Sequence, residues 1–270
     1  MPFAKIEGRQ LHYTDYASSS NSPTALAIVL VHGLGSTQNY YGPILPYLTD
    51  YRCITFDNYG AGRSKYLSDM HPDTSIEQIA DDVLGLMDYL KVDKAVVVGY
   101  SMGGMVPTTI AASKKGAGRI ISAICIGPVH PSPQVAEVFV QRVKTVTEGG
   151  IETMANTIPN AATGPSTTQL QKSFIREMIM SQDPEGYCAN CKAIEAAKSP
   201  KYDAVQCPIY IIAGEVDKSA PVSGCQFIHD SLTGVSDKKM DVVKGMGHWY
   251  CVEDPDDIGK KIAGWCSKFA

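Results

Sequence analysis

The sequence lacks a long apolar run, an excess of basic charge and any internal repeat. Its first 16 residues alternate apolar and polar side chains, so we expect neither a signal peptide nor a membrane-spanning helix there. The 24 basic residues are outnumbered by 28 acidic ones, and the one basic cluster, at Lys238, Lys239 and Lys244, is interleaved with aspartates. We therefore expect no nucleic-acid partner and no membrane partner.

The sequence also lacks the two cysteine pairs of a zinc site. Of eight cysteines, only Cys188 and Cys191 form a Cys-x-x-Cys pair, without a second pair or a strand–helix–strand context. Cys53, Cys125 and Cys207 lie in or beside predicted core strands, and 270 residues close a core that needs no disulfides. We expect reduced thiols, a cytoplasmic protein, a packing role for the Cys-x-x-Cys pair, and no metal or other cofactor.

Apolar β-branched runs alternate with helical patterns along most of the chain, which predicts a mostly parallel sheet of eight strands with helices on both faces. Between the fourth and fifth strands, Thr74 and Glu77 have the spacing of a capping box before an amphipathic helix. The polar segment 18–23 is predicted to be a hairpin connection. The predicted strands are the segment before Gly8 and residues 11–16, 25–31, 51–57, 94–100, 120–126, 208–214 and 238–244.

Residues 132–205 contain only helical patterns, at 134–146, 151–158, 167–181 and 184–198. A block of this kind between two sheet strands predicts a helical insertion that covers one edge of the sheet. The expected division of the chain is a core of residues 1–131 and 206–270 and an inserted helical block of residues 132–205.

The stretch VVVGYSMGGM, residues 97–106, ends a buried strand on a serine between glycines. A nucleophilic serine stands on a turn so sharp that only small residues fit two positions before and after it. Gly99 and Gly103 occupy these positions around Ser101. We interpret Ser101 as a nucleophile, and a glycine-rich turn without a catalytic role is the alternative.

Candidate partners for this serine follow two later strands. Asp217 comes after the seventh predicted strand and His248 after the eighth. An imidazole on such a loop can accept the serine proton, while a carboxylate fixes its tautomer and stabilises the imidazolium. The chain order Ser101, Asp217, His248 is that of acyl hydrolases. Glu215 and Glu253 are the alternative acids.

Two backbone amides are candidates for binding a developing oxyanion. VLVHGLGS, residues 29–36, places a loop directly after the third strand, and Leu34 is the predicted donor there. The second predicted donor is Met102, at the start of the helix that follows the serine, where free amides favour negative charge. The His32 side chain is interpreted as a loop histidine that bonds to backbone.

These residues resemble the motifs of the α/β-hydrolase superfamily over nearly the whole chain. HGLG, DNYGAGRS (residues 57–64), GYSMGG, GEVD and GMGHW match the motifs of that superfamily in order and spacing. The resemblance implies the α/β-hydrolase fold, an acyl-enzyme on Ser101, a tight turn at residues 57–64 and a cap role for residues 132–205. Serine at this position argues against the epoxide hydrolase and haloalkane dehalogenase branches, whose nucleophile is a carboxylate.

Within the superfamily, QDPEGYCANCKAI at residues 182–194 resembles the branch of 3-oxoadipate enol-lactonases and small esterases. The segment IGPVHPSP after the sixth strand departs from that branch, which has a polar loop there. An anionic lactone calls for a basic contact, and Arg142 and Arg176 are the candidates. His130 is either a polar pocket contact or a packed loop histidine. Apolar pocket walls are expected from Tyr40, Tyr41, Met105 and Trp249, with ordinary core packing as the alternative.

The sequence thus predicts a serine hydrolase of a small carboxylic ester or lactone, with a lactonase favoured over a plain esterase. Two alternatives use the same three side chains. One is cleavage of a carbon–carbon bond in a β-diketone-like substrate, or a lyase reaction, and the other is a ligand receptor with slow turnover. A monomer and a homodimer are both open.

Overall fold

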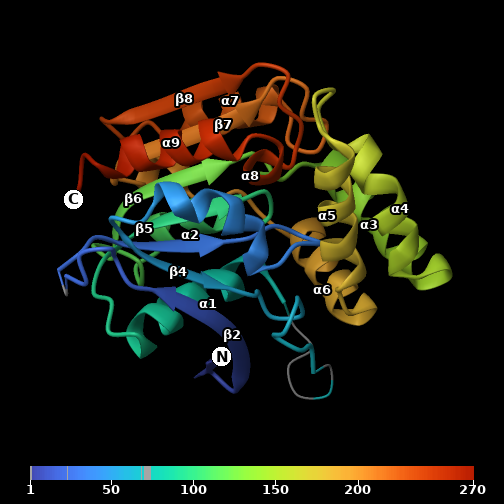
Figure 1. Cartoon of the computed structure of the whole chain (residues 1–270), viewed down its shortest axis with the longest axis horizontal. Coiled ribbons are helices and arrows are strands. Elements are labelled where there is room, and N and C mark those ends of the chain that lie inside the picture. Colours follow the sequence, from blue (N-terminus) through green and yellow to red (C-terminus); the bar gives the residue numbers. More distant parts are fainter. Residues whose placement is uncertain (1, 23, 68, 70–73) are drawn as a thin grey trace.

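The computed structural model describes residues 2–22, 24–67, 69 and 74–270, so that Pro23 of the predicted hairpin connection lies outside the described residues. These residues form an eight-stranded sheet in the order β1-β2-β4-β3-β5-β6-β7-β8 (Figure 1). Within the same residues, we find no helix with the length and apolar character needed to cross a membrane. The strands are β1 (Phe3–Ile6), β2 (Arg9–Tyr16), β3 (Ala27–Val31), β4 (Arg52–Phe56), β5 (Ala95–Tyr100), β6 (Ile120–Ile126), β7 (Ile209–Gly214) and β8 (Lys238–Val243).

The sheet is antiparallel at one edge and parallel elsewhere, as predicted. β1 and β2 form a hairpin across Glu7 and Gly8, and the neighbours from β4 to β8 are parallel. The predicted hairpin connection at residues 18–23 is wrong, because β2 pairs with β4, which lies between β2 and β3. Pairing partners such as Tyr13 and Phe56 are far apart in sequence, so no local pattern marks them.

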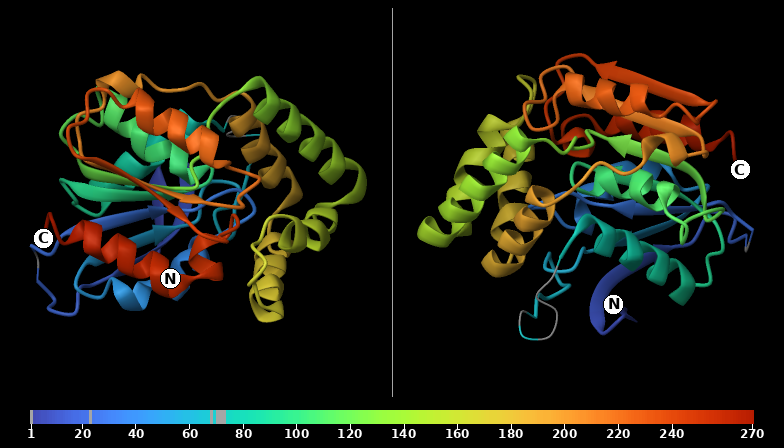
Figure 2. Two further views of the ribbon diagram at one scale, coloured as in Figure 1. Left: turned by 90° about the horizontal axis from the view of Figure 1, so that it is seen from above. Right: turned by 180° about the vertical axis from the view of Figure 1, so that it is seen from behind.

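Successive residues of the central strands alternate between two apolar clusters, one on each face of the sheet. In β3, Val29 belongs to the first cluster and Leu30 to the second. Burial on both faces explains why these strands are apolar without polar alternation. Figure 2 shows the sheet between two layers of helices. The first cluster includes α1 (Ile76–Tyr89), α2 (Val106–Ala112) and α7 (Val222–Ser231), and the second includes the 3₁₀-helical η1 (Gln38–Tyr47), α8 (Tyr250–Glu253) and α9 (Pro255–Cys266).

Helix α1 begins one residue later than the predicted capping box. Ser75 is the N-cap, and its hydroxyl accepts a hydrogen bond from the Gln78 amide at 3.0 Å. Thr74 is therefore not the cap, and its buried hydroxyl has no partner among the described residues. The capping-box spacing is present twice, in Thr74 with Glu77 and in Ser75 with Gln78, so the sequence alone fits two helix starts one residue apart.

The segment between β6 and β7 holds α3 (Pro133–Gly149), α4 (Ile151–Ala161), α5 (Gln169–Met180) and α6 (Pro184–Glu195), close to the predicted helical patterns. These helices lie together beside the carboxyl ends of the strands (Figure 1). All eight cysteines are unpaired, and Cys191 of α6 packs into the first apolar cluster. We call residues 132–205 the helical block below.

Candidate active site

Ser101 stands on a strained turn between β5 and η2 (Gly103–Met105), and its φ angle is +56°. A Cβ at Gly99 would collide with the carbonyl of Gly103, and a Cβ at Gly103 would collide with the carbonyl oxygens of Val31 and His32. Both neighbours must therefore be glycine for the turn to close. A non-glycine residue held at positive φ is costly, and such strain gathers at functional sites.

His248 connects Ser101 with Asp217. The Nε2 atom of His248 lies 2.9 Å from Ser101 Oγ, and its Nδ1 atom lies 2.7 Å from Asp217 Oδ2. A carboxylate only accepts hydrogen bonds, so Nδ1 carries the ring proton and Nε2 accepts from the serine hydroxyl. The three side chains come from the ends of β5, β7 and β8, and all are buried.

The carboxylate of Asp217 accepts from four donors. Its Oδ1 atom accepts from the amides of Ser219 (2.8 Å) and Ala220 (2.9 Å), and its Oδ2 atom accepts from His248 and from the Tyr250 hydroxyl (2.8 Å). Burial opposes the charged form, but His248 and the other donors outweigh it and hold the pKa of Asp217 below its usual range. Asp217 is therefore a charged partner for the imidazole.

The two alternative acids do not contact the His248 ring. Glu215 accepts from the Gly245 amide at 2.8 Å on the exposed side of the turn. Glu253 accepts from the Gly247 amide (3.1 Å) and the Trp249 amide (2.7 Å), which flank His248. Its Oε2 atom also accepts from the Gly164 amide (2.7 Å) and the Thr167 hydroxyl (3.2 Å) of the helical block. Glu253 thus ties the loop of His248 to that block.

The loop after β3 passes against the candidate nucleophile. A Cβ at Gly33 would lie 2.8 Å from the Cβ of Ser101, so only glycine permits this approach. The amides of Leu34 and Met102, which the sequence predicts as oxyanion donors, donate to no backbone carbonyl among the described residues. Two unengaged amides beside a serine hydroxyl are what an oxyanion site requires.

His32 anchors this loop. Its Nδ1 atom lies 2.8 Å from the Gly33 carbonyl oxygen, and its Nε2 atom lies 2.9 Å from the Asn58 amide. Because an amide N–H only donates, Nε2 accepts and Nδ1–H donates to the Gly33 carbonyl; burial also lowers the pKa of His32 and favours this neutral ring. The C=O and N–H of one trans peptide point in opposite directions, so anchoring this carbonyl turns the Leu34 amide away from the ring.

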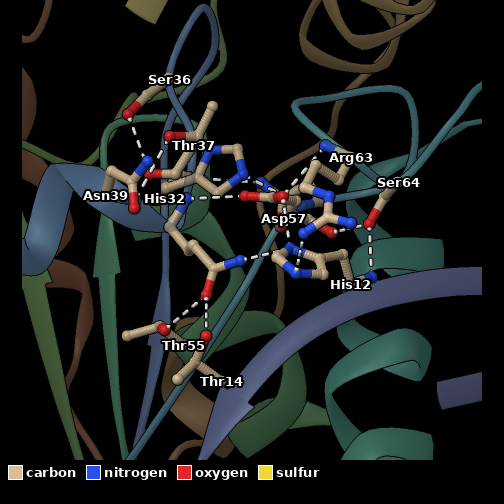
Figure 3. Close-up of polar contacts among 12 residues, drawn as sticks. His12, Thr14, His32, Ser36, Thr37, Asn39, Thr55, Asp57, Arg63 and Ser64 are labelled. Atoms are coloured by element: carbon tan, nitrogen blue, oxygen red, sulfur yellow. Dashed lines mark hydrogen bonds and ion pairs between the residues drawn. The ribbon is translucent and has the colours of Figure 1, made fainter. Parts of the chain in front are cut away.

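A buried polar network centred on Asp57 joins the start of η1, which follows this loop, to the turn at residues 57–64 and to β2 (Figure 3). Asp57, which begins the predicted turn at residues 57–64, accepts from the amides of Gln38 (2.8 Å) and Arg63 (3.0 Å). Its Oδ2 atom also lies 3.1 Å from His12 Nδ1. A Cβ at Gly62 would lie 2.7 Å from this carboxylate, which explains the glycine there.

A cavity of about 390 Å³ opens beside Ser101 and His248. Of the predicted pocket residues, Arg142 and Trp249 line it. Leu34, the predicted oxyanion donor, and apolar residues of α3 such as Val135 and Phe139 also line it.

The other predicted wall residues, Tyr40, Tyr41 and Met105, do not line this cavity. Tyr40 stacks on Tyr100 at 4.0 Å within the second cluster, and the Tyr41 hydroxyl donates to the Val31 carbonyl at 2.8 Å. Met105 packs in the first cluster. These residues match the alternative of ordinary core packing rather than the predicted pocket walls, because Tyr40 and Tyr41 of η1 and Met105 of η2 point their side chains into the two apolar clusters.

His130 and Arg176 also lie outside the lining. The His130 ring packs on Phe227 with centroids 4.3 Å apart, which matches the packed alternative. Arg176 forms ion pairs with Glu152 (3.2 Å) and Glu177 (2.9 Å). The prediction of a pocket contact is therefore wrong for Arg176, since its position on α5 directs it toward α4 and solvent.

Sequence reasoning missed the contacts of Tyr250 and the presence of Lys218 in the cavity lining. The Tyr250 hydroxyl donates to Asp217 and accepts from the Gly214 amide at 2.8 Å, which joins two loops. Tyr250 follows the histidine by two residues, and no pattern distinguishes it from a core tyrosine. Lys218 directly follows the predicted acid Asp217 in the sequence, so its place near the cavity could have been predicted.

The chain matches the model of the α/β-hydrolase fold family over residues 27–255. It is 27% identical to the esterase YbfF of Escherichia coli (strain K12), with 90% of this chain and 92% of the esterase covered. It is 25% identical to 3-oxoadipate enol-lactonase 2 of Acinetobacter baylyi, with 76% and 77% covered. Among solved structures, the enol-lactonase of Burkholderia xenovorans LB400 superposes with a TM-score of 0.87 at 26% identity, covering 98% of this chain and 100% of that one.

Proposed function

The chain belongs to the α/β-hydrolase fold family, and from this premise we propose that it is a serine hydrolase of a small carboxylic ester or lactone. The observation that carries the proposal is the hydrogen-bonded chain from Ser101 through His248 to Asp217 at the wall of a cavity. Similarity to a named esterase and a named enol-lactonase supports this reaction class. The resemblance of residues 182–194 to the enol-lactonase branch favours a lactone.

In the proposed first step, Ser101 Oγ attacks the carbonyl carbon while its proton passes to His248 Nε2. A bond forms between Oγ and carbon, and the carbonyl π electrons move onto oxygen. The amides of Leu34 and Met102 are proposed to bind that oxyanion, and each such donor contributes about 3 kcal/mol to transition-state stabilisation.

The oxyanion then collapses and breaks the bond between carbon and the ester oxygen, which takes the proton from His248. In a lactone, the leaving alcohol stays attached to the acyl group. A water molecule, deprotonated by His248, attacks the acyl-enzyme and releases the carboxylic acid with Ser101 restored. The proposed reaction uses these side chains without a cofactor.

We also propose that residues 132–205 act as a cap, because Arg142 and Phe139 of α3 form part of the cavity wall. The eight unpaired cysteines support the proposal of a cytoplasmic location.

Replacement of the serine tests the proposal. Ser101→Ala should remove measurable hydrolysis of p-nitrophenyl acetate and of short lactones, while the thermal unfolding transition stays within a few degrees of the parent protein. Full activity in this variant would contradict the assignment of the nucleophile.

Two further substrate panels separate the alternatives. Turnover of β-diketones that exceeds turnover of esters would identify carbon–carbon cleavage. A kcat far below about 10 s⁻¹ on every acyl substrate would favour the receptor.

A further inference from the structure

The Tyr250 hydroxyl contacts the Asp217 carboxylate at the same oxygen that faces the imidazole. Asp217 Oδ2 accepts from His248 Nδ1 at 2.7 Å and from the Tyr250 hydroxyl at 2.8 Å, whereas the donors on Oδ1 are the amides of Ser219 and Ala220. Two side-chain donors therefore share the negative charge of one oxygen.

The direction of the hydrogen bonds at Tyr250 is fixed. An amide only donates, so the tyrosine oxygen accepts from the Gly214 amide at 2.8 Å, and its proton is directed to Asp217. Burial and the nearby Asp217 charge raise the pKa of Tyr250 well above its usual value, so the hydroxyl keeps its proton. In such a chain each bond polarises the next, and the Gly214 amide makes the hydroxyl a stronger donor.

The Tyr250 ring is enclosed by the ends of three strands. A Cβ at Gly127, directly after β6, would lie 2.6 Å from this ring. The ring of Tyr100, the last residue of β5, meets it edge-on with centroids 6.3 Å apart, and Gly214 ends β7. Tyr250 is fully buried, so its hydroxyl is held in one place against Asp217.

We propose that Tyr250 is a positioning residue for the reaction at Ser101: its hydroxyl holds the Asp217 carboxylate and takes up part of the charge on Oδ2, which limits how strongly that carboxylate stabilises the His248 imidazolium. This inference rests on the proposed function, because it assigns a role within the same site. A carboxylate with fewer donors stabilises the imidazolium more, and the imidazole then takes up its proton at higher pH. Tyr250 thus extends to lower pH the range in which His248 is a base.

Other titratable or charged groups also surround the imidazole and Tyr250. They are Ser101 and Tyr100 from the end of β5, Lys218 from the turn after β7, Cys225 of α7, Arg142 of α3 and Glu253 of α8. Each of them is still present when only the Tyr250 hydroxyl is removed. A change in pH dependence upon that removal therefore reports on the hydroxyl.

Replacement of Tyr250 by phenylalanine tests this inference. In Tyr250→Phe, the acid limb of kcat/KM for p-nitrophenyl acetate should move to higher pH by about 0.5–1 unit, because the Asp217 charge is less neutralised. The plateau value of kcat should fall about threefold to tenfold with KM within about twofold, since the carboxylate is held less firmly. A merely structural role would lower stability and kcat without moving the acid limb.

Tyr210→Phe is the matched control. The Tyr210 hydroxyl donates to the Asp241 carboxylate at 2.5 Å, between the neighbouring strands β7 and β8 and away from the triad. This variant also loses a bond between a tyrosine and a carboxylate. It should therefore cost stability and leave the acid limb in place.

A second variant keeps the test open if Tyr250→Phe fails to fold. 3-Fluorotyrosine in place of Tyr250 retains the hydroxyl and makes it a stronger donor, so the acid limb should move to lower pH. An acid limb that stays in place in the variants that fold, or that moves in the same direction in both, would overturn the inference and leave the proposed function standing.

If the parent protein hydrolyses no ester or lactone, the proposed function fails, and NMR titration of the histidine rings decides the inference separately. In Ser101→Ala, the His248 ring is identified by its absence in His248→Gln. Addition of Tyr250→Phe should make this ring take up its proton at higher pH. Equal titration with and without the hydroxyl would overturn the inference.

Discussion

The carboxylate of Asp217 is buried and yet has a lowered pKa, because His248, two amides and the Tyr250 hydroxyl all donate to it. A carboxyl with a lower pKa in the folded than in the unfolded state stabilises the fold above its unfolded value of about 3.9. That contribution is lost as the pH falls through the lower folded value. Asp217 therefore stays charged at neutral pH and adds to stability there.

Replacement of this side chain tests its role. Asp217→Asn should lower kcat by about 10⁴-fold, because the amide no longer holds the imidazole in the required tautomer. Since the carboxylate is charged throughout, the loss should be present at every pH from about 6 to 9. Steady-state kinetics across that range measure it. Glu215→Gln is the control, and a larger loss in that variant would show that Glu215 is the acid.

At the scale of the elements, the loop after β8 is held by Glu253. One carboxylate binds the amides on both sides of His248 and two groups of the helical block. A carboxylate accepts at both oxygens, whereas an amide accepts at only one, so a glutamine here would set its NH₂ group against N–H donors.

Glu253→Gln should therefore loosen the His248 loop and lower kcat by about tenfold with a smaller change in KM. Hydrogen exchange of the Gly247 and Trp249 amides should speed up in the same variant. Glu215→Gln, which frees only the Gly245 amide of this loop, is the matched control. Unchanged exchange together with unchanged kcat would show that the loop does not depend on Glu253.

The turn at Ser101 gives a second prediction at this scale. Gly103→Ala should destabilise the protein by about 2 kcal/mol or more and reduce activity, because its Cβ meets the Val31 and His32 carbonyls. Gly264, in α9, has open space around its Cβ position, and Gly264→Ala should stabilise by about 0.5–1 kcal/mol. Urea unfolding of both variants measures the difference, and equal effects would contradict the geometry.

The elements that bear local patterns were predictable. Unbroken apolar runs marked strands buried on both faces, and Gly99 and Gly103 marked the turn at Ser101. The direction in which a helical side chain points could not be predicted. Arg142 and Arg176 lie in similar amphipathic patterns, and only packing decides which of them faces the cavity. Tyr40 likewise has the composition of a pocket wall but stacks on Tyr100 inside the core.

At the scale of the whole molecule, thiol burial follows the two apolar clusters. Six cysteines are buried, and only Cys188 and Cys207 are partly exposed. Burial raises the pKa of Cys53, Cys191, Cys225, Cys251 and Cys266 to about 12. The reactive thiolate is thus scarce at neutral pH.

Titration with a thiol reagent at pH 8 should accordingly show no more than two readily modified cysteines in the native protein and all eight after unfolding. Fewer than eight thiols in the unfolded, unreduced protein would show that disulfides form. Fast modification of more than two in the native state would contradict the packing of the clusters.

The backbone amide of His248 donates to the carbonyl of Ala162 at 2.7 Å, beside the bonds that join Glu253 to Gly164. The loop that carries His248 is thus held by hydrogen bonds to the connection between α4 and α5. If the connection between α4 and α5 moves outward, the loop loses its bonds to Ala162 and Gly164, and His248 moves away from Ser101. Under the proposed function, outward movement of the helical block at this connection and activation of Ser101 by His248 would therefore exclude each other.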